Sequence, residues 1–78
     1  TLQHRFAMLT PRGREVLPLV VSGFLNKQAA AELGISLVTL QIHRGKIMRK
    51  MEAGSLAELV RMAGTLGIPV TRARAAQS

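Results

Sequence analysis

Cysteine is absent from this sequence of 78 residues. Its absence excludes disulfides, thiolate metal sites and cysteine nucleophiles, and it fits a reducing compartment. The sequence also has no Trp or Tyr and only two Phe, so the aromatic residues that favour strands are nearly missing. No run without Lys, Arg, Asp or Glu exceeds 11 residues, whereas a membrane-spanning helix needs roughly 20. We therefore expect neither a redox protein nor a membrane-spanning one.

Acidic residues are scarce, with 4 Asp plus Glu against 11 Lys plus Arg and a net charge of +7. This balance predicts a polyanionic partner. The few acids and the two His are scattered without paired spacing, which disfavours an enzyme. The 47% of hydrophobic residues suffices for one packed domain. Because the chain begins at Thr1 with no Met or signal peptide, we expect it to be a piece of a longer protein.

Apolar residues at helical spacing, bounded by caps and glycines, predict an all-α fold, a compact four-helix bundle. Thr10 precedes Pro11 as a cap, Asn26 caps the second helix, Ser36 the third and Ser55 the fourth. The second and third helices form a helix-turn-helix. The predicted helices cover residues 11–22, 27–33, 36–51 and 55–66. Residues 1–9 lack a helical period and are interpreted as the end of an interdomain linker, residues 10–67 as the domain, and residues 68–78 as a mobile tail.

The third predicted helix has two different faces. Its core side carries Leu37, Leu40, Ile47, Met48 and Met51, and its other side carries Val38, Ile42, Gly45, Lys46 and Arg49 with Gln41 at the edge. This mixture suits a DNA major groove, where Gln can bond a base edge, Ile42 can meet a thymine methyl and cations reach phosphates. Between Ser36 and Lys50 there are four Lys or Arg and no acid, as a nucleic-acid contact requires.

Simpler interpretations stand beside this one. Lys and Arg on a helix are usually only solvated, although Ile42 on the outward face has no packing reason in a monomer. Lys27 either reaches a phosphate or is a surface lysine, and His43 is a packed or phosphate-bonding side chain rather than a metal ligand, so we expect no metal or cofactor. Arg44 falls on the core side, where an arginine must either extend its guanidinium to solvent or find a carboxylate, for which Glu15 and Glu32 are the candidates.

The fourth helix carries a predicted core stripe made of Leu56, Leu59, Val60 and Ala63. Met62 and Leu66 widen this stripe beyond what one neighbour covers. The surplus predicts either a partner surface or a methionine that fills a gap in the same core. A dimer would place two recognition helices one turn of DNA apart.

Several spaced motifs resemble the LuxR-type helix-turn-helix, above all the FixJ/NarL group of two-component response regulators. They are Leu9-Thr10-Pro11-Arg12, Glu15-Val16-Leu17, Gly23, Asn26-Lys27-Gln28, Ala30, Leu33-Gly34-Ile35-Ser36, Thr39, His43-Arg44 and Ile47-Met48-Arg49-Lys50-Met51. The resemblance covers residues 9–67.

The resemblance implies the C-terminal effector domain of a bacterial transcription regulator in the cytoplasm, whose third helix enters the major groove. The base-reading positions correspond to Gln41, Ile42 and Gly45. The phosphate contacts correspond to Asn26, Lys27, Thr39, His43 and Lys46, and the cation Arg49 joins them from the outward face. The dimer interface on the fourth helix is expected at Leu59, Met62, Ala63 and Leu66. Implied partners are double-stranded DNA, a second copy, a receiver domain in a phosphorelay and RNA polymerase, but no membrane.

Three positions depart from the family pattern. Gly13 stands where the family has a Glu that would complete a capping box with Thr10 and could pair with Arg44. Without this Glu we expect the first helix to begin less stably and Arg44 to lack its partner. Leu25 replaces a common Ser or Thr, and Gly45 replaces a cation of some relatives, which implies a weaker or different base contact.

Two further classes of function remain as alternatives. A basic helical module could dock an acidic protein, such as polymerase or a receiver domain, and would then show no preference among DNA sequences. An amphipathic membrane-surface peptide is disfavoured, because caps and glycines divide the chain into short helices.

Overall fold

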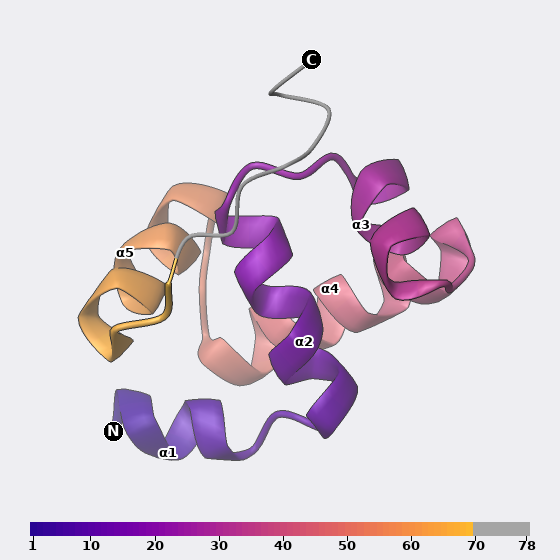
Figure 1. Cartoon of the computed structure of the whole chain (residues 1–78). Coiled ribbons are helices and arrows are strands. Elements are labelled where there is room, and N and C mark those ends of the chain that lie inside the picture. Colours follow the sequence, from indigo (N-terminus) through magenta and orange to yellow (C-terminus); the bar gives the residue numbers. More distant parts are fainter. Residues whose placement is uncertain (70–78) are drawn as a thin grey trace.

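A computed structural model describes residues 1–69 and contains five helices (Figure 1). They are α1 Leu2–Ala7, α2 Pro11–Val21, α3 Asn26–Leu33, α4 Leu37–Met51 and α5 Leu56–Leu66. No strand occurs in this part of the chain, so the all-α prediction is confirmed. The ends of α2 to α5 differ from the predicted ends by at most one residue. Of the tail predicted at residues 68–78, residues 70–78 lie outside the described residues.

The helix ends follow from the capping residues of the sequence. The hydroxyl oxygens of Thr10, Ser36 and Ser55 each accept a hydrogen bond, 3.1 Å long, from the backbone N–H three residues later. These bonds satisfy N–H groups that have no partner within the helix. Gly23 and Gly34 have φ angles of 89° and 67°, which glycine adopts most easily. Gly34 thereby makes the turn between α3 and α4.

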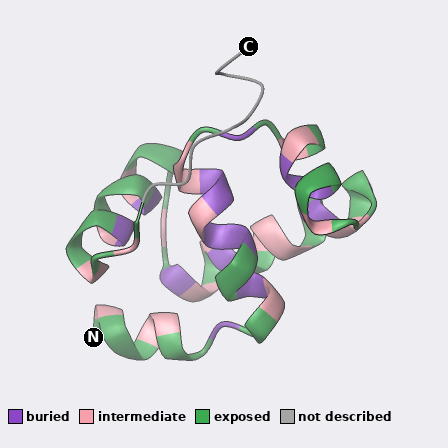
Figure 2. Cartoon of the chain, viewed as in Figure 1, coloured by how far each residue is buried: buried purple, intermediate pink, exposed green. Residues whose placement is uncertain are grey.

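The core lies around α2, which crosses the centre of the molecule with α3 and α5 on either side (Figure 1). Buried positions concentrate on α2 and on the faces turned toward it (Figure 2). The largest fully buried side chains are Leu17, Leu40, Ile47, Met51, Leu59 and Val16. Because three of them belong to α4, the packing on α2 fixes the rotation of α4 about its own axis.

Three apolar residues predicted in the core are exposed instead. Leu37 is 44% exposed, Leu56 40% and Val60 43%. Leu37 is the first residue of α4, and α5 lies at the edge of the fold, where Leu59 and Ala63 form its buried positions. A helix at the edge of a fold buries only part of its apolar surface, so the placement of Leu56 and Val60 in the core stripe of α5 is wrong. Met62 and Leu66 pack half-buried against the core.

The prediction of no helix in residues 1–9 is also wrong, because α1 lies there. Leu2 and Phe6 pack half-buried against the core, and Leu9 is buried. Arg5 forms an ion pair with Glu52, with 3.3 Å between Nε and Oε2, and its Nη1 donates to the Met51 carbonyl. Six residues are too few to show a helical period in sequence, so tertiary contacts hold α1 in place.

After α5, the chain returns to the core at Ile68. Ile68 is half-buried against the core, and its N–H donates to the Ala63 carbonyl at 3.0 Å. Ile68, the first residue of the predicted tail, is therefore part of the fold.

Candidate nucleic-acid interface

The outward face of α4 is an open surface of mixed chemistry. Val38 is 65% exposed and Ile42 52%, while the core side of the same helix is buried at three positions. The exposed residues of α4 are Leu37, Val38, Gln41, Ile42, Lys46 and Arg49, and Gly45 is half-exposed among them. Apart from Leu37, the two faces predicted from the sequence are confirmed.

The turn between α3 and α4 sets how α4 is presented. The Ile35 N–H donates to the Ala30 carbonyl at 3.0 Å, which closes the turn around Gly34. Ala29 and Ala30 are buried, so their small side chains let α3 lie close to its neighbours. The turn and this close packing give the helix-turn-helix a fixed geometry.

Arg44 joins the two helices of this motif. Its Nη1 donates to the Oδ1 of Asn26 at 2.7 Å in a partly buried position. The expected partners, Glu15 and Glu32, are replaced by this amide oxygen. Arg44 therefore has an acceptor despite Gly13, contrary to the expectation drawn from the missing glutamate.

The sequence predicted Asn26 as the cap of α3, but this prediction is wrong, because Asn26 is the first residue inside the helix. Leu25 occupies the cap position without a side-chain hydrogen bond. Gln28 instead accepts the Leu25 N–H on its Oε1 at 3.0 Å. Asn26 is thus free to serve Arg44 with its oxygen, while its amide NH₂ remains a donor.

The cations of α4 divide into bound and free groups. Arg44 is held by Asn26, and Lys50 donates from Nζ to the Met8 carbonyl at 3.1 Å. Within residues 1–69, Lys46 and Arg49 have no hydrogen-bond or ion-pair acceptor and both are exposed. The positive charge of α4 that is available to a ligand therefore lies on its outward face.

Other predicted phosphate contacts lie near this face. Lys27 is exposed on the first turn of α3, again without an acceptor in the described part of the chain. Thr39 is half-buried, and its hydroxyl oxygen accepts a hydrogen bond from the Ser36 hydroxyl at 2.9 Å. Within residues 1–69 the Thr39 hydroxyl proton has no acceptor, so it can be donated to an oxygen outside the chain.

Gly45 leaves a gap in the outward face. A Cβ at this position would lie 3.5 Å from Nη1 of Arg49. Side chains of a helix lean toward its N-terminus, so Arg49 extends over the turn that contains Gly45. The guanidinium thus lies beside the position at which some family members carry a cation.

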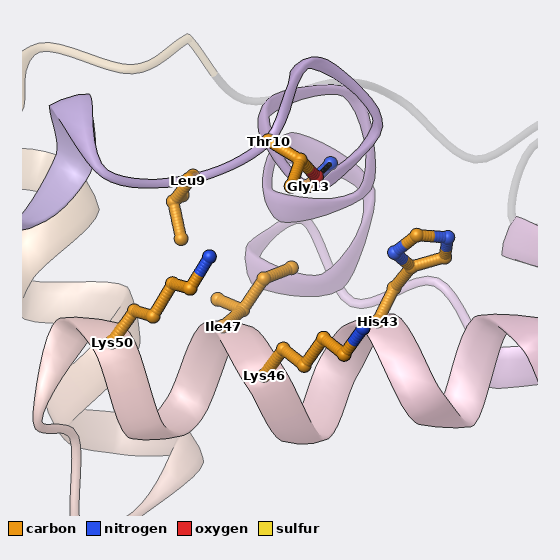
Figure 3. A pocket seen from close by; sticks show the side chains of 7 residues that line it. All are labelled: Leu9, Thr10, Gly13, His43, Lys46, Ile47 and Lys50. Atoms are coloured by element: carbon orange, nitrogen blue, oxygen red, sulfur yellow. Dashed lines mark hydrogen bonds between the residues drawn. The ribbon is translucent and has the colours of Figure 1, made fainter.

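A small hollow separates α4 from the start of α2 (Figure 3). Its lining residues are Leu9, Thr10, Gly13, His43, Lys46, Ile47 and Lys50. The side chains of His43, Lys46 and Lys50 come from α4, whereas Arg44 is not among the lining residues. Gly13 is buried there, and a Cβ on it would lie 3.3 Å from Oγ1 of Thr10 and 3.8 Å from Cγ1 of Ile47.

Restoring the family's carboxylate by Gly13→Glu is expected to stabilise the domain by about 1 kcal/mol. Glu favours a helix over Gly, suits its first turn and can complete a capping box with Thr10. The lining lysines add attraction, and only the tight contact with the Thr10 hydroxyl opposes it. Urea unfolding of wild type, Gly13→Glu and Gly13→Ala separates the carboxylate from the backbone effect. A glutamate variant less stable than wild type would show that the tight contact dominates.

The residues predicted for the dimer interface are largely used within the single chain. Leu59 and Ala63 are buried in the core, and Met62 and Leu66 pack half-buried against it. Leu59 and Ala63 therefore present almost no surface to a partner. The exposed large apolar residues of α5 are Leu56 and Val60.

None of the helices in residues 1–69 is both long and apolar enough to span a membrane.

The fold and this surface define a class, the helix-turn-helix DNA-binding domains, in which a short helix supports a recognition helix with an exposed, acid-free face. A family model described as "Bacterial regulatory proteins, luxR family" matches residues 7–63. The chain belongs to this family, which comprises DNA-binding transcription regulators and is not an enzyme class.

The chain is similar to part of several longer proteins, among them a response regulator. It is 52% identical over 67 residues to nodulation protein W of Bradyrhizobium diazoefficiens, covering 86% of this chain and 30% of that protein. The structure resembles response regulator StyR with a TM-score of 0.80 and 45% identity, covering 82% of this chain and 32% of the other. Full-length FixJ from B. japonicum gives a TM-score of 0.78 and 41% identity, covering 87% and 34%. The chain thus spans about a third of the length of these proteins.

Proposed function

We propose that α4 enters the major groove of double-stranded DNA and reads its sequence through Gln41, Ile42 and Gly45. The observation that carries this proposal is the exposed face of α4, on which Gln41 and Ile42 lie next to the unpaired cations Lys46 and Arg49 with no carboxylate in residues 36–50. Gln supplies a donor and an acceptor for a base edge, and cations supply phosphate contacts. The proposed phosphate contacts are Asn26, Lys27, Thr39, His43, Lys46 and Arg49.

A second copy binding through α5 is the second part of the proposal. We assign this interface to the exposed Leu56 and Val60, with Met62 and Leu66 at its edge. The predicted Leu59 and Ala63 are buried in the core. So small an apolar surface favours dimerisation on DNA, where two adjacent half-sites raise the effective concentration of the partner.

The whole protein is proposed to be a bacterial response regulator in which this domain is the output. Relatives about three times as long support a further domain, which we take to be a phosphorylated receiver. The protein would act on transcription in the cytoplasm, with RNA polymerase as a further partner.

The proposal is tested by selecting bound sequences from random duplex DNA and titrating the selected site. Lys46→Ala is expected to weaken binding to all sequences and to lower the slope of log affinity against log salt by about 1, because one phosphate contact is lost. Gln41→Ala is expected to change preference among sites by about tenfold while the salt slope stays the same.

Arg61→Ala is the matched control for charge, because Arg61 is an exposed cation of α5 whose side chain has no hydrogen-bond or ion-pair partner within residues 1–69. It should leave both affinity and slope near the wild-type values. An equal loss of affinity in Arg61→Ala and Lys46→Ala would mean that the net charge of the domain, and not a contact of Lys46, causes the effect. Failure to enrich any sequence would favour the protein-docking alternative.

A further inference from the structure

Two exposed branched residues lie one helical turn apart on α4. Val38 is 65% exposed and Ile42 52%, and neither belongs to the core cluster or to the residues packed against it. Positions four apart in a helix lie on the same face, with about 5–6 Å between their Cβ atoms. Together they form a continuous apolar strip, which we call the Val38–Ile42 pair.

Folding does not account for this pair. Val and Ile have lower helix propensity than Ala or Leu, and exposed apolar surface contributes nothing to the core. A polar residue at Val38 would serve the helix equally well. A contact outside the chain is therefore the remaining physical reason for two branched apolar side chains here.

From these positions, and on the basis of the proposed DNA binding, we infer that Val38 is a further base-reading residue that acts with Ile42 to bind thymine methyl groups. Among base edges in the major groove, the C5-methyl of thymine is the apolar group, since the others present donors and acceptors. Val38 is the second residue of α4, and recognition helices meet base edges through their N-terminal residues.

The spacing of the pair limits the DNA sequence. Successive bases on one strand lie about 3.4 Å apart, so side chains about 5–6 Å apart reach methyl groups on adjacent or next-but-one base pairs. Each half-site therefore contains two thymines within three consecutive base pairs, on either strand.

Deoxyuridine tests this inference, because it lacks the methyl group of thymidine and keeps its hydrogen-bonding groups. Each thymine of the selected site is replaced by deoxyuridine in turn, and affinity is measured for wild type, Val38→Ala, Ile42→Ala and Met8→Ala. At two thymines of a half-site, wild type should lose affinity about three- to five-fold, the effect of exposing one buried methyl-sized group.

The variants assign each methyl to its side chain. Val38→Ala should abolish the deoxyuridine effect at one thymine and keep it at the other, and Ile42→Ala should do the reverse. Met8→Ala truncates an exposed apolar side chain at the end of α1, outside α4 and the proposed dimer interface, so both effects should persist in it. Melting temperatures check that each variant is folded, which is expected because all three side chains are exposed.

The inference fails in two recognisable ways. If Val38→Ala and wild type respond equally to deoxyuridine at every thymine, or if the selected half-site has no such thymine pair, Val38 does not read a methyl group although specific DNA binding stands. If no sequence is enriched at all, the proposed function itself fails and this inference falls with it.

Discussion

Leu40→Ala is expected to lower the free energy of unfolding by about 3 kcal/mol. Leu40 is fully buried at 0% exposure on the core side of α4, a helix that packs against both α2 and α3. Removing its side chain leaves a cavity in a domain whose total stability is roughly 4–12 kcal/mol for its size. The corresponding fall in Tm is about 12–24 °C, measurable by circular dichroism during heating.

Leu37→Ala provides the control, because it is the same substitution in the same helix at a residue that is 44% exposed. It is expected to cost less than about 1 kcal/mol. Similar losses for the two variants would mean that the face of α4 assigned to the core is wrong. Such a result would also mean that the proposed reading face does not point toward DNA.

Asn26→Ala is expected to destabilise the domain by about 1.5 kcal/mol. The change removes the acceptor of the 2.7 Å hydrogen bond from Arg44 and leaves a guanidinium partly buried without that partner. Water reaches part of this site, since both residues are half-exposed, so the loss stays below that of a fully buried charge. Urea unfolding followed by circular dichroism measures it.

A double-mutant cycle with Arg44→Met separates this bond from other effects of Asn26. Methionine keeps most of the apolar stem of arginine and removes the charge. In the Arg44→Met background, Asn26→Ala should cost much less than in wild type, because the bond is already absent. Additive losses would show that Asn26 stabilises α3 by itself and does not join α3 to α4.

The sequence predicted well what depends on neighbouring residues. Thr10, Ser36 and Ser55 signal helix starts because a cap acts over three residues, and Gly34 signals a turn because few other residues adopt its φ angle. The outward position of Ile42 followed from helical spacing alone. Each of these features needs no knowledge of the tertiary fold.

Features that depend on distant residues were missed. The acceptor of Arg44 lies 18 residues away on another helix, and α1 is held by Arg5 contacts 46 residues or more along the chain. Leu56 and Val60 were predicted in the core because helical spacing shows which residues share a face, but not how much of that face a neighbouring helix covers. The width of the buried stripe on α5 depends on the position of this helix at the edge of the fold.

The attachments of α4 have a consequence for the thermodynamics of recognition. Its start is fixed by the Ser36 cap, its middle by Arg44 on Asn26, and its end by Lys50 on the Met8 carbonyl and by Arg5 on the Met51 carbonyl. The backbone of α4 therefore loses its conformational entropy when the chain folds, before any DNA is present. Differences in affinity among DNA sequences then arise from side-chain contacts and from the deformation of the duplex, not from ordering of this helix.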